Sequence, residues 1–213
     1  AAISCGRQPY AVQTDDGGRI PARAVIIATG AEYRKPPLEN LSRFEGAGIY
    51  YGATPMEAQL CVDEEVVVIG GGNSAGQAAV FLAEKAKRVH VLVRSDGLSD
   101  SMSRYLIRRI EDNPAIVLLT RTEVIALEGR QHLERVRWRN NRTGEEKTRD
   151  IRHVFVMTGA APNTRWLNGC LMLDGNGFIK TGPDLSADDL AAANWRLGRP
   201  PHPLATSPAG VLG

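Results

Sequence analysis

Residues 65–76, Glu65-Val-Val-Val-Ile-Gly-Gly-Gly-Asn-Ser-Ala-Gly76, decide the fold of this 213-residue chain. The β-branched run at the start predicts a buried strand, and the three glycines after it predict a tight turn. Residues 74–87 are rich in alanine and predict a helix, and residues 89–93 predict a second strand. The strand, helix and strand together span 29 residues, the size of one βαβ unit. The sequence therefore predicts a doubly wound α/β domain.

The glycine-rich turn has the spacing Gly70-x-Gly72-x-x-Ala75, a variant of the fingerprint that binds dinucleotides. Gly70 permits the tight turn, Gly72 lets the backbone approach a pyrophosphate, and Ala75 is small enough for close packing of helix on strand. The helix that begins at this turn presents unpaired N–H groups to an anion. Glycine-rich turns also occur where nothing binds, but the strand before this turn and the helix after it favour a dinucleotide site.

The end of the second predicted strand distinguishes the two nicotinamide dinucleotides. NAD sites usually place an acid there to accept a hydrogen bond from the ribose 2′-hydroxyl, whereas NADP sites place Arg to meet a 2′-phosphate. Here Arg94 and Ser95 follow the strand, and Arg104 and Arg108 add positive charge on the next predicted helix. A guanidinium holds a phosphate through two hydrogen bonds, so we predict NADPH. Asp96 lies close by and leaves NAD as the alternative.

Further segments frame this unit. Two apolar strands end in the same pair of residues, residues 24–28 at Thr29-Gly30 and residues 154–157 at Thr158-Gly159. Alternating residues between 122 and 152 predict a small antiparallel meander. The other predicted elements are a hairpin at 11–20, an extended connection at 33–51, a helix at 103–113, a strand at 115–119 and a short helix near 187–194.

The composition excludes several classes of protein. Hydrophobic residues make up 43% of the chain and charged residues 23%, as in a soluble globular protein. The net charge of +2 is too balanced for a protein built around a polyanion, so we expect no nucleic-acid partner. No apolar run reaches the ~18–20 residues of a membrane span, and we expect no membrane partner. The first residues lack the features of a signal peptide.

The three cysteines, Cys5, Cys61 and Cys170, are few, odd in number and far apart. This argues against a disulfide framework and fits a reducing, cytoplasmic setting. The sequence contains no CxxC pair and only four scattered histidines, so we expect no metal site.

Three stretches carry a resemblance to a known family. They are residues 66–86, the triplet Ala28-Thr29-Gly30, and residues 154–164. Their motifs, order and spacing resemble those of the thioredoxin reductase-like flavoproteins, in the pyridine nucleotide–disulfide oxidoreductase superfamily. The resemblance implies a Rossmann-like NADPH-binding domain over residues 45–164. This domain is inserted between two parts of an FAD-binding domain, residues 1–44 and residues 165–213.

The resemblance also implies roles for individual residues. Gly70, Gly72, Asn73, Ser74 and Ala75 match the nucleotide-binding loop of the family. Gln77 falls where the family often carries a polar or acidic residue on the nicotinamide side. The remaining matches are Thr158 and Gly159 at a strand end that lines the nucleotide, and Thr29 and Gly30 at the strand end that approaches the flavin.

Two departures from the family pattern affect the predicted reaction. The segment that matches the redox CxxC is Gly52-Ala-Thr-Pro55, so both cysteines are replaced. Dithiol exchange requires one thiolate to attack and a second thiol to resolve the mixed disulfide, and Cys61 stands alone. In addition, no GxGxxG precedes Ala24, and the chain stops at Gly213, where the family's second flavin-binding motif would continue. We therefore expect the chain to be a fragment that is inactive alone.

These observations lead to an expected function. In the full-length protein, which the resemblance implies is a homodimer, hydride passes from NADPH to FAD. The electrons then leave to an unknown acceptor: a ferredoxin-type carrier, a quinone, oxygen or a disulfide protein. The cofactors supply this chemistry, so we assign no catalytic acid, base or nucleophile. The alternative is a nucleotide-binding module without turnover, used for redox sensing or regulation.

Overall fold

The computed structural model describes residues 2–5, 9–167, 169–195 and 197–213. The chain forms two compact units. Unit 1 comprises residues 1–32 and 160–213, and unit 2 comprises residues 33–159. Unit 2 is thus inserted between the two segments of unit 1, as the sequence predicts. Unit 2 begins at residue 33, which is 12 residues before the predicted start at residue 45. The second segment of unit 1 begins at residue 160, which is five residues before the predicted start at residue 165.

Unit 2 is built on a five-stranded parallel sheet with the order β6-β13-β7-β8-β9. The strands are β6 (Ile49–Tyr50), β7 (Glu65–Ile69), β8 (Arg88–Leu92), β9 (Ile116–Leu119) and β13 (His153–Val156). Strand β7 has partners on both sides, and residues 66–68 are fully buried. This explains why its sequence is continuously apolar rather than alternating.

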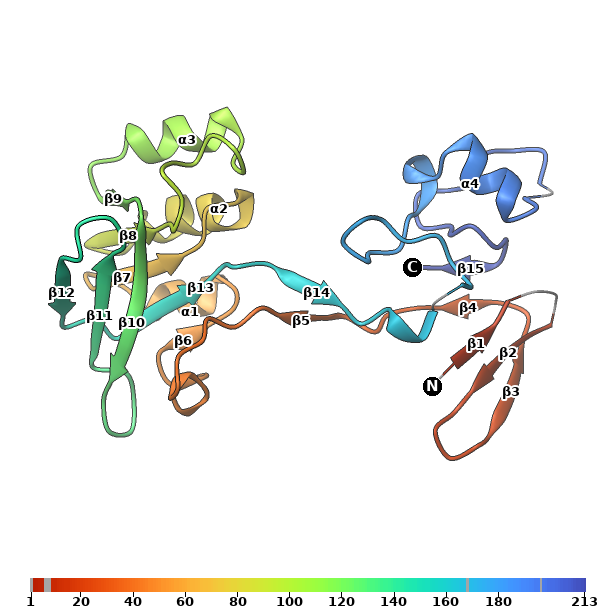
Figure 1. The fold of residues 1–213 in the computed structure, drawn as a ribbon, viewed down its shortest axis with the longest axis horizontal. Helices are drawn as coiled ribbons and strands as arrows, with labels where there is room; N and C mark the ends of the chain where they lie inside the picture. The colour runs from red at the N-terminus through yellow and green to blue at the C-terminus, as the bar shows by residue number, and fades with distance from the viewer. Residues whose placement is uncertain (1, 6–8, 168, 196) are drawn as a thin grey trace. The chain divides into compact units, whose positions relative to one another are not determined.

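Different layers cover the two faces of this sheet (Figure 1). The helices α1 (Pro55–Leu60), α2 (Asn73–Leu82) and α3 (Arg104–Glu111) share one core with Val66 and Val68. The antiparallel meander of β10 (Thr122–Glu128), β11 (Arg135–Asn140) and β12 (Glu146–Arg149) shares the other core with Val67. Successive residues of β7 therefore serve opposite cores. These observations confirm the predicted α/β class and the appended meander.

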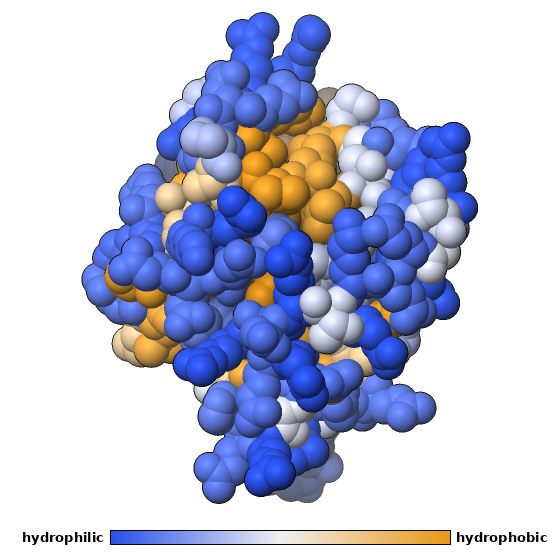
Figure 2. Space-filling view, turned by 90° about the vertical axis from the view of Figure 1, so that its left-hand side faces the viewer, coloured by the Kyte–Doolittle hydropathy of each residue, from blue (hydrophilic) through white to orange (hydrophobic). Residues whose placement is uncertain are grey.

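The surface of unit 2 is mostly polar. Figure 2 shows charged and polar side chains over most of the face turned to the viewer, with one large apolar patch in the upper part of the view and smaller apolar areas elsewhere. Strand β9 lies at the edge of the parallel sheet, and its last three residues are only partly buried. Among the described residues, no helix is both long and apolar enough to cross a membrane.

Unit 1 contains short elements. An antiparallel sheet is formed by β1 (Ala2–Ser4), β2 (Tyr10–Gln13) and β3 (Arg19–Ala22), with the predicted turn between β2 and β3. Strand β4 (Val25–Ile26) pairs in parallel with β15 (Val211–Leu212). The 3₁₀ turns η2 (Arg165–Leu167) and η3 (Gly182–Asp184) and helix α4 (Ala187–Ala192) complete the unit. Its small core comprises Tyr10, Ile27, Leu167, Leu171 and Val211.

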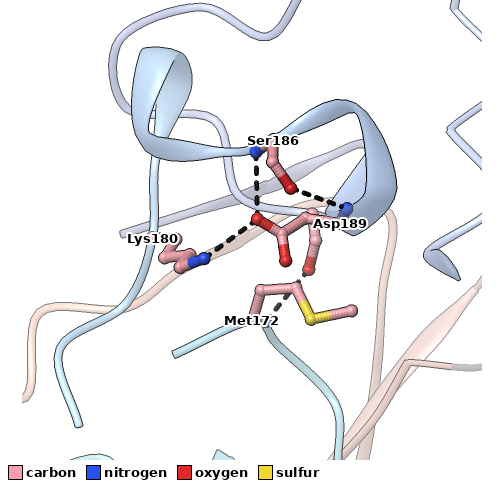
Figure 3. A network of polar contacts seen from close by, with 5 residues as sticks. Met172, Lys180, Ser186 and Asp189 are labelled. Carbon is pink, nitrogen blue, oxygen red and sulfur yellow. Dashed lines mark hydrogen bonds and ion pairs between the residues drawn. The ribbon is translucent and has the colours of Figure 1, made fainter. Parts of the chain in front are cut away.

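Helix α4 begins with a capping box (Figure 3). The Ser186 amide donates to the Asp189 carboxylate at 2.9 Å, and the Asp189 amide donates to the Ser186 hydroxyl at 3.1 Å. Lys180 also pairs with this carboxylate at 3.0 Å. The Ser186 amide and the Lys180 ammonium hold the pKa of Asp189 below its ordinary value. These contacts define where a six-residue helix starts.

Three predictions of local structure are corrected. The strand expected over residues 24–28 is reduced to β4, which has one hydrogen-bonded neighbour, and Ile26 is 76% exposed. The helix expected over residues 74–87 ends at Leu82, where tight turns replace the helical pattern. The expected extended connection at 33–51 contains β6 and the 3₁₀ turn η1 (Leu41–Phe44), whose Phe44 is fully buried. Helix α3 is confirmed within a residue or two at each end.

The cysteine prediction is also corrected. Cys5 and Cys170 form a disulfide, with their Cα atoms 5.6 Å apart and 165 positions between them in sequence. Both residues belong to unit 1, because the chain returns to this unit after forming unit 2. Distance along the chain therefore says nothing about distance in space for these two residues.

Two short strands lie where the chain passes between the units. They are β5 (Ala31–Tyr33) and β14 (Ala160–Pro162), and they pair with each other.

Candidate functional site

A cavity of about 490 Å³ lies at the carboxyl ends of the central strands of unit 2. Strands β7, β8 and β13 are parallel neighbours, so all three end at the same edge of the sheet. This edge is where doubly wound folds bind their ligands. The cavity is lined by Ile69, Gly70, Gly71, Gly72, Asn73, Ser74, Leu92, Val93, Arg94, Ser95, Ser101, Met157, Thr158 and Gly159.

Gly70 is required by the backbone at the end of β7. Its φ is +145°, a conformation that residues with a Cβ rarely adopt. A Cβ on Gly70 would lie 2.4 Å from the carbonyl oxygen of Met157, which follows β13. The absence of a side chain therefore allows the turn after β7 to pass against the end of β13.

Gly72 has a different role. It is the N-cap of α2, its φ is −92°, and no side chain caps the helix there. A Cβ on Gly72 would meet Ser101 O at 3.8 Å and nothing closer. The backbone is therefore open to the cavity, beside the free N–H groups of the first helical turn. This is the arrangement in which a helix N-terminus accepts a phosphate.

The loop between β8 and α3 is attached to the glycine turn by two hydrogen bonds that the sequence analysis did not predict. The Ser101 hydroxyl donates to Gly71 O at 2.8 Å, and the Ser103 amide donates to the Asn73 side-chain oxygen at 2.7 Å. Ser101 also lines the cavity. No spacing pattern marks Ser101, because its position depends on the path of the eleven-residue loop between β8 and α3.

The predicted phosphate-binding residues separate into two groups. Arg94 and Ser95 follow β8 directly and line the cavity. Arg104 is exposed at the start of α3 and is not part of the cavity lining. The carboxylate of Asp96, the residue that left NAD as an alternative, pairs with Arg121 at 2.5 Å.

The end of β13 is held by residue 34 of the same unit. The Thr158 hydroxyl donates to the carbonyl of Arg34, and the Arg34 amide donates to Gly159 O at 2.9 Å. Gly159 has a φ of +91°, in a region of backbone conformation that favours glycine. Thr158 and Gly159 thus form the wall of the cavity opposite Arg94.

Two other predicted residues of unit 2 lie away from the cavity. Ala75 is fully buried where α2 packs on the sheet, which fits its expected packing role. Gln77 lines a separate groove of about 420 Å³ between α2 and α3, together with Tyr105 and Arg109. Asn73 lines both the groove and the cavity.

Thr29 and Gly30 line a third cavity, of about 320 Å³, in unit 1. The Thr29 hydroxyl donates to Asn163 O at 3.0 Å, and the Asn163 side chain donates back to Thr29 O at 3.1 Å. Ile27, Ile179 and Phe178 provide apolar walls.

The residues present fit the two expected cofactors to different extents. The uncapped N-terminus of α2, the open space at Gly72 and the cation of Arg94 fit a dinucleotide with a 2′-phosphate. The third cavity offers apolar walls to a flat ring, but it contains no charged residue and no glycine-rich turn for a pyrophosphate. Unit 1 therefore fits one edge of a flavin site.

Neither thiol chemistry nor a metal centre is built into unit 2. Pro55 is the first residue of α1, where Thr54 and Glu57 form a capping box. Cys61 follows this helix and is fully buried, and burial raises the pKa of its thiol to about 11. Within the described part of the chain, no three His, Cys, Asp or Glu residues gather in a way that could hold a metal ion.

Comparisons with known proteins agree with this geometry. The family model described as pyridine nucleotide-disulphide oxidoreductase matches residues 2–189. A thioredoxin reductase from Mycolicibacterium smegmatis is 35% identical over 159 residues, which are 75% of this chain and 50% of that protein. A thioredoxin reductase from Streptomyces coelicolor is 34% identical over 168 residues, 78% of this chain and 51% of that protein. The chain thus spans about half the length of these curated relatives.

A solved structure shows the same fold. Thioredoxin reductase from Giardia duodenalis superposes with a TM-score of 0.80 at 22% identity, covering 99% of this chain and 63% of that one. The superposition covers both units. The parallel sheet, the meander and the inserted arrangement of unit 2 are therefore those of a thioredoxin reductase fold. The chain belongs to the pyridine nucleotide-disulphide oxidoreductase family, as a thioredoxin reductase-like member of it.

Proposed function

We propose that the whole protein is an NADPH-dependent FAD oxidoreductase, to which this chain contributes the nucleotide-binding domain and part of the flavin-binding domain. One observation carries the proposal. The cavity at the carboxyl ends of β7, β8 and β13 brings the uncapped N-terminus of α2 together with Arg94. A helix N-terminus and a guanidinium are the groups that bind a pyrophosphate and a 2′-phosphate.

The proposed roles follow from positions around the cavity. The N–H groups of Asn73 and Ser74 at the start of α2 bind the pyrophosphate, and Gly72 leaves room for it. Arg94 and Ser95 bind the 2′-phosphate, and Thr158 and Gly159 form the wall along the nucleotide. NADPH supplies a hydride and a bound flavin accepts it. Thr29 and Gly30 are the residues of this chain that we assign to the flavin.

The electron acceptor is proposed to differ from that of a dithiol enzyme. Gly52 and Pro55 occupy the positions that the resemblance assigns to the redox pair, and the Cys61 thiol is protonated at neutral pH. Electrons therefore leave the flavin directly, to a ferredoxin-type carrier, a quinone, oxygen or a disulfide protein. We place this activity in a homodimer of the full-length protein, and a cytoplasmic location requires that the bond between Cys5 and Cys170 persist in a reducing compartment.

The flavin chemistry is tested on the full-length protein. We expect it to purify with an FAD absorption band that NADPH bleaches under anaerobic conditions. Nucleotide binding by a full-length protein that holds no flavin would instead establish the alternative, a regulatory nucleotide-binding module without turnover. Screening the four acceptor classes for NADPH-driven reduction then identifies the electron acceptor.

The choice of dinucleotide is tested on the 213-residue chain by calorimetric titration. Arg94→Ala should weaken NADPH binding by about 10- to 100-fold, because hydrogen bonds to charged groups contribute roughly 1.5–3 kcal/mol each. NADH binding should change less than threefold. Arg104→Ala is the matched control, since Arg104 is exposed and outside the cavity lining. Equal losses for NADPH and NADH in Arg94→Ala would refute the assignment of Arg94.

A further inference from the structure

The acid that lies closest in sequence to Arg94 pairs with a neighbouring side chain. Asp96 lies two residues after Arg94, where a free carboxylate would repel a 2′-phosphate and favour the ribose hydroxyl of NAD. The Asp96 carboxylate instead lies 2.5 Å from the guanidinium of Arg121. Arg94 and Ser95 line the cavity and Asp96 does not.

Arg121 is also attached to this loop through its backbone. It lies in the turn between β9 and β10, and its amide donates to Ser95 O at 2.9 Å. The next amide, that of Thr122, donates to Val93 O at 2.9 Å. The turn therefore contacts the loop on both sides of Arg94. Any shift of the turn would move the proposed phosphate site with it.

The conformation of Arg121 adds a third observation. Its φ is +52°, in the left-handed region where Asn and Gly are favoured and most other residues are strained. The backbone amide of Asn141 stabilises the turn by donating a hydrogen bond to Arg121 O. An arginine in this conformation has a backbone cost, which the hydrogen bonds of its amide and carbonyl groups offset in part. Its side chain pairs with the carboxylate of Asp96.

We propose that Arg121 is a positioning residue that makes the site selective for NADPH, by neutralising Asp96 and drawing it away from Arg94. This inference rests on the proposed NADPH site and adds a residue on another element to it. Arg121 itself does not touch the nucleotide. Its effect on a 2′-phosphate is electrostatic and acts through the carboxylate.

The size of the effect follows from the charges involved. Removing the Arg121 cation leaves the Asp96 anion unpaired within several ångströms of a doubly charged phosphate. For groups in contact with solvent, such a charge weakens binding roughly three- to tenfold. Both side chains are partly exposed, at 38% for Arg121 and 74% for Asp96, so the effect should shrink as salt is added. NADH lacks the 2′-phosphate and should bind as before or more tightly.

The test measures binding of NADPH, NADH and adenosine 2′,5′-bisphosphate to the 213-residue chain. The main variant is Arg121→Asn, because Asn is neutral and tolerates the left-handed backbone, so the turn is retained. We expect a three- to tenfold loss for the two 2′-phosphate ligands and no loss for NADH. Arg121→Lys keeps the positive charge, so this variant should retain most of the wild-type preference for NADPH over NADH. In the double variant Asp96→Asn/Arg121→Asn, affinity for the 2′-phosphate ligands should return to within about twofold of wild type.

The outcomes separate this inference from the proposed function. If wild type binds NADH as tightly as NADPH, the NADPH site fails and this inference fails with it. If wild type prefers NADPH but Arg121→Asn leaves the ratio of the two affinities unchanged, only the role of Arg121 is refuted. A loss that Asp96→Asn does not rescue would also refute it, because Arg121 would then not act through Asp96.

Discussion

Replacing Gly70 or Gly72 with alanine should separate the folding role of the glycine turn from its binding role. Both residues line the cavity and both belong to the same fingerprint. The structure nevertheless places them in different surroundings. Gly70 passes against the end of β13, whereas Gly72 faces open space.

The magnitudes follow from the contacts that each new Cβ would make. At Gly70 it would lie 2.4 Å from the oxygen and 2.9 Å from the carbon of the Met157 carbonyl. The backbone would have to move, and the φ of +145° would be strained as well. Strain of this kind costs about 1–3 kcal/mol, and overpacking costs a similar amount. Gly70→Ala should therefore reduce the free energy of unfolding of unit 2 by about 2–5 kcal/mol.

Gly72→Ala should leave unit 2 folded and still prevent binding. Its φ of −92° suits alanine, and the nearest atom to the new Cβ is Ser101 O at 3.8 Å. Exchanging glycine for alanine at an N-cap costs about 1 kcal/mol or less. The methyl group would occupy the space that we assign to the pyrophosphate. We expect NADPH affinity to fall at least tenfold, a loss of about 1.4 kcal/mol or more in binding free energy.

The assay combines urea unfolding with hydrogen exchange and calorimetry on the 213-residue chain. Peptides from β7 and β13 should lose exchange protection in Gly70→Ala and keep it in Gly72→Ala. Wild-type stability in Gly70→Ala would refute the close approach at Met157. Wild-type NADPH affinity in Gly72→Ala would refute the placement of the pyrophosphate at the start of α2.

Three further predictions concern the thiols and unit 1. Burial raises the pKa of the Cys61 thiol to about 11 from an ordinary 9.0. Cys61 should therefore react with iodoacetamide at pH 8 about 100-fold more slowly than an exposed thiol. A reaction rate equal to that of an exposed thiol would contradict the burial of Cys61. The Ser186 amide and, after it, the Lys180 ammonium lower the pKa of Asp189, which stabilises unit 1 above about pH 4; this stabilisation is lost as pH falls through the folded-state pKa. Asp189→Asn should therefore flatten the acid limb of a stability–pH curve, and an unchanged slope would exclude Asp189 as a source of the pH dependence. Reducing the disulfide between Cys5 and Cys170 should lower the free energy of unfolding of unit 1 by up to about 4 kcal/mol. When unit 2 stays folded, the flexible loop that this disulfide closes contains about 39 residues, which sets the size of the effect. The hydrogen-exchange protection of unit 2 should stay unchanged and serves as the control.

The local pattern of the sequence was sufficient to predict the centre of unit 2. The apolar run of β7, the glycines after it and the alanine-rich helix follow one another in the sequence, and each has a local pattern that indicates a strand, a turn or a helix. Their register was therefore readable, and β7 begins and ends where the pattern predicts. Gly70, Gly72, Arg94 and Thr158 were also predicted, because strand ends and glycine spacing mark them directly, and the fold brings all four to one cavity.

Contacts between segments far apart in sequence were not predictable in this way. Asp96 and Arg121 are 25 positions apart, and their pairing depends on β8 and β9 lying side by side. Cys5 and Cys170 pair because the segments before and after unit 2 both belong to unit 1. A sequence pattern records which residues prefer to be buried or to turn, and so it determined the α/β class and the nucleotide loop. Which charges and thiols face one another is decided by the packing of whole elements, and only the tertiary structure contains that information.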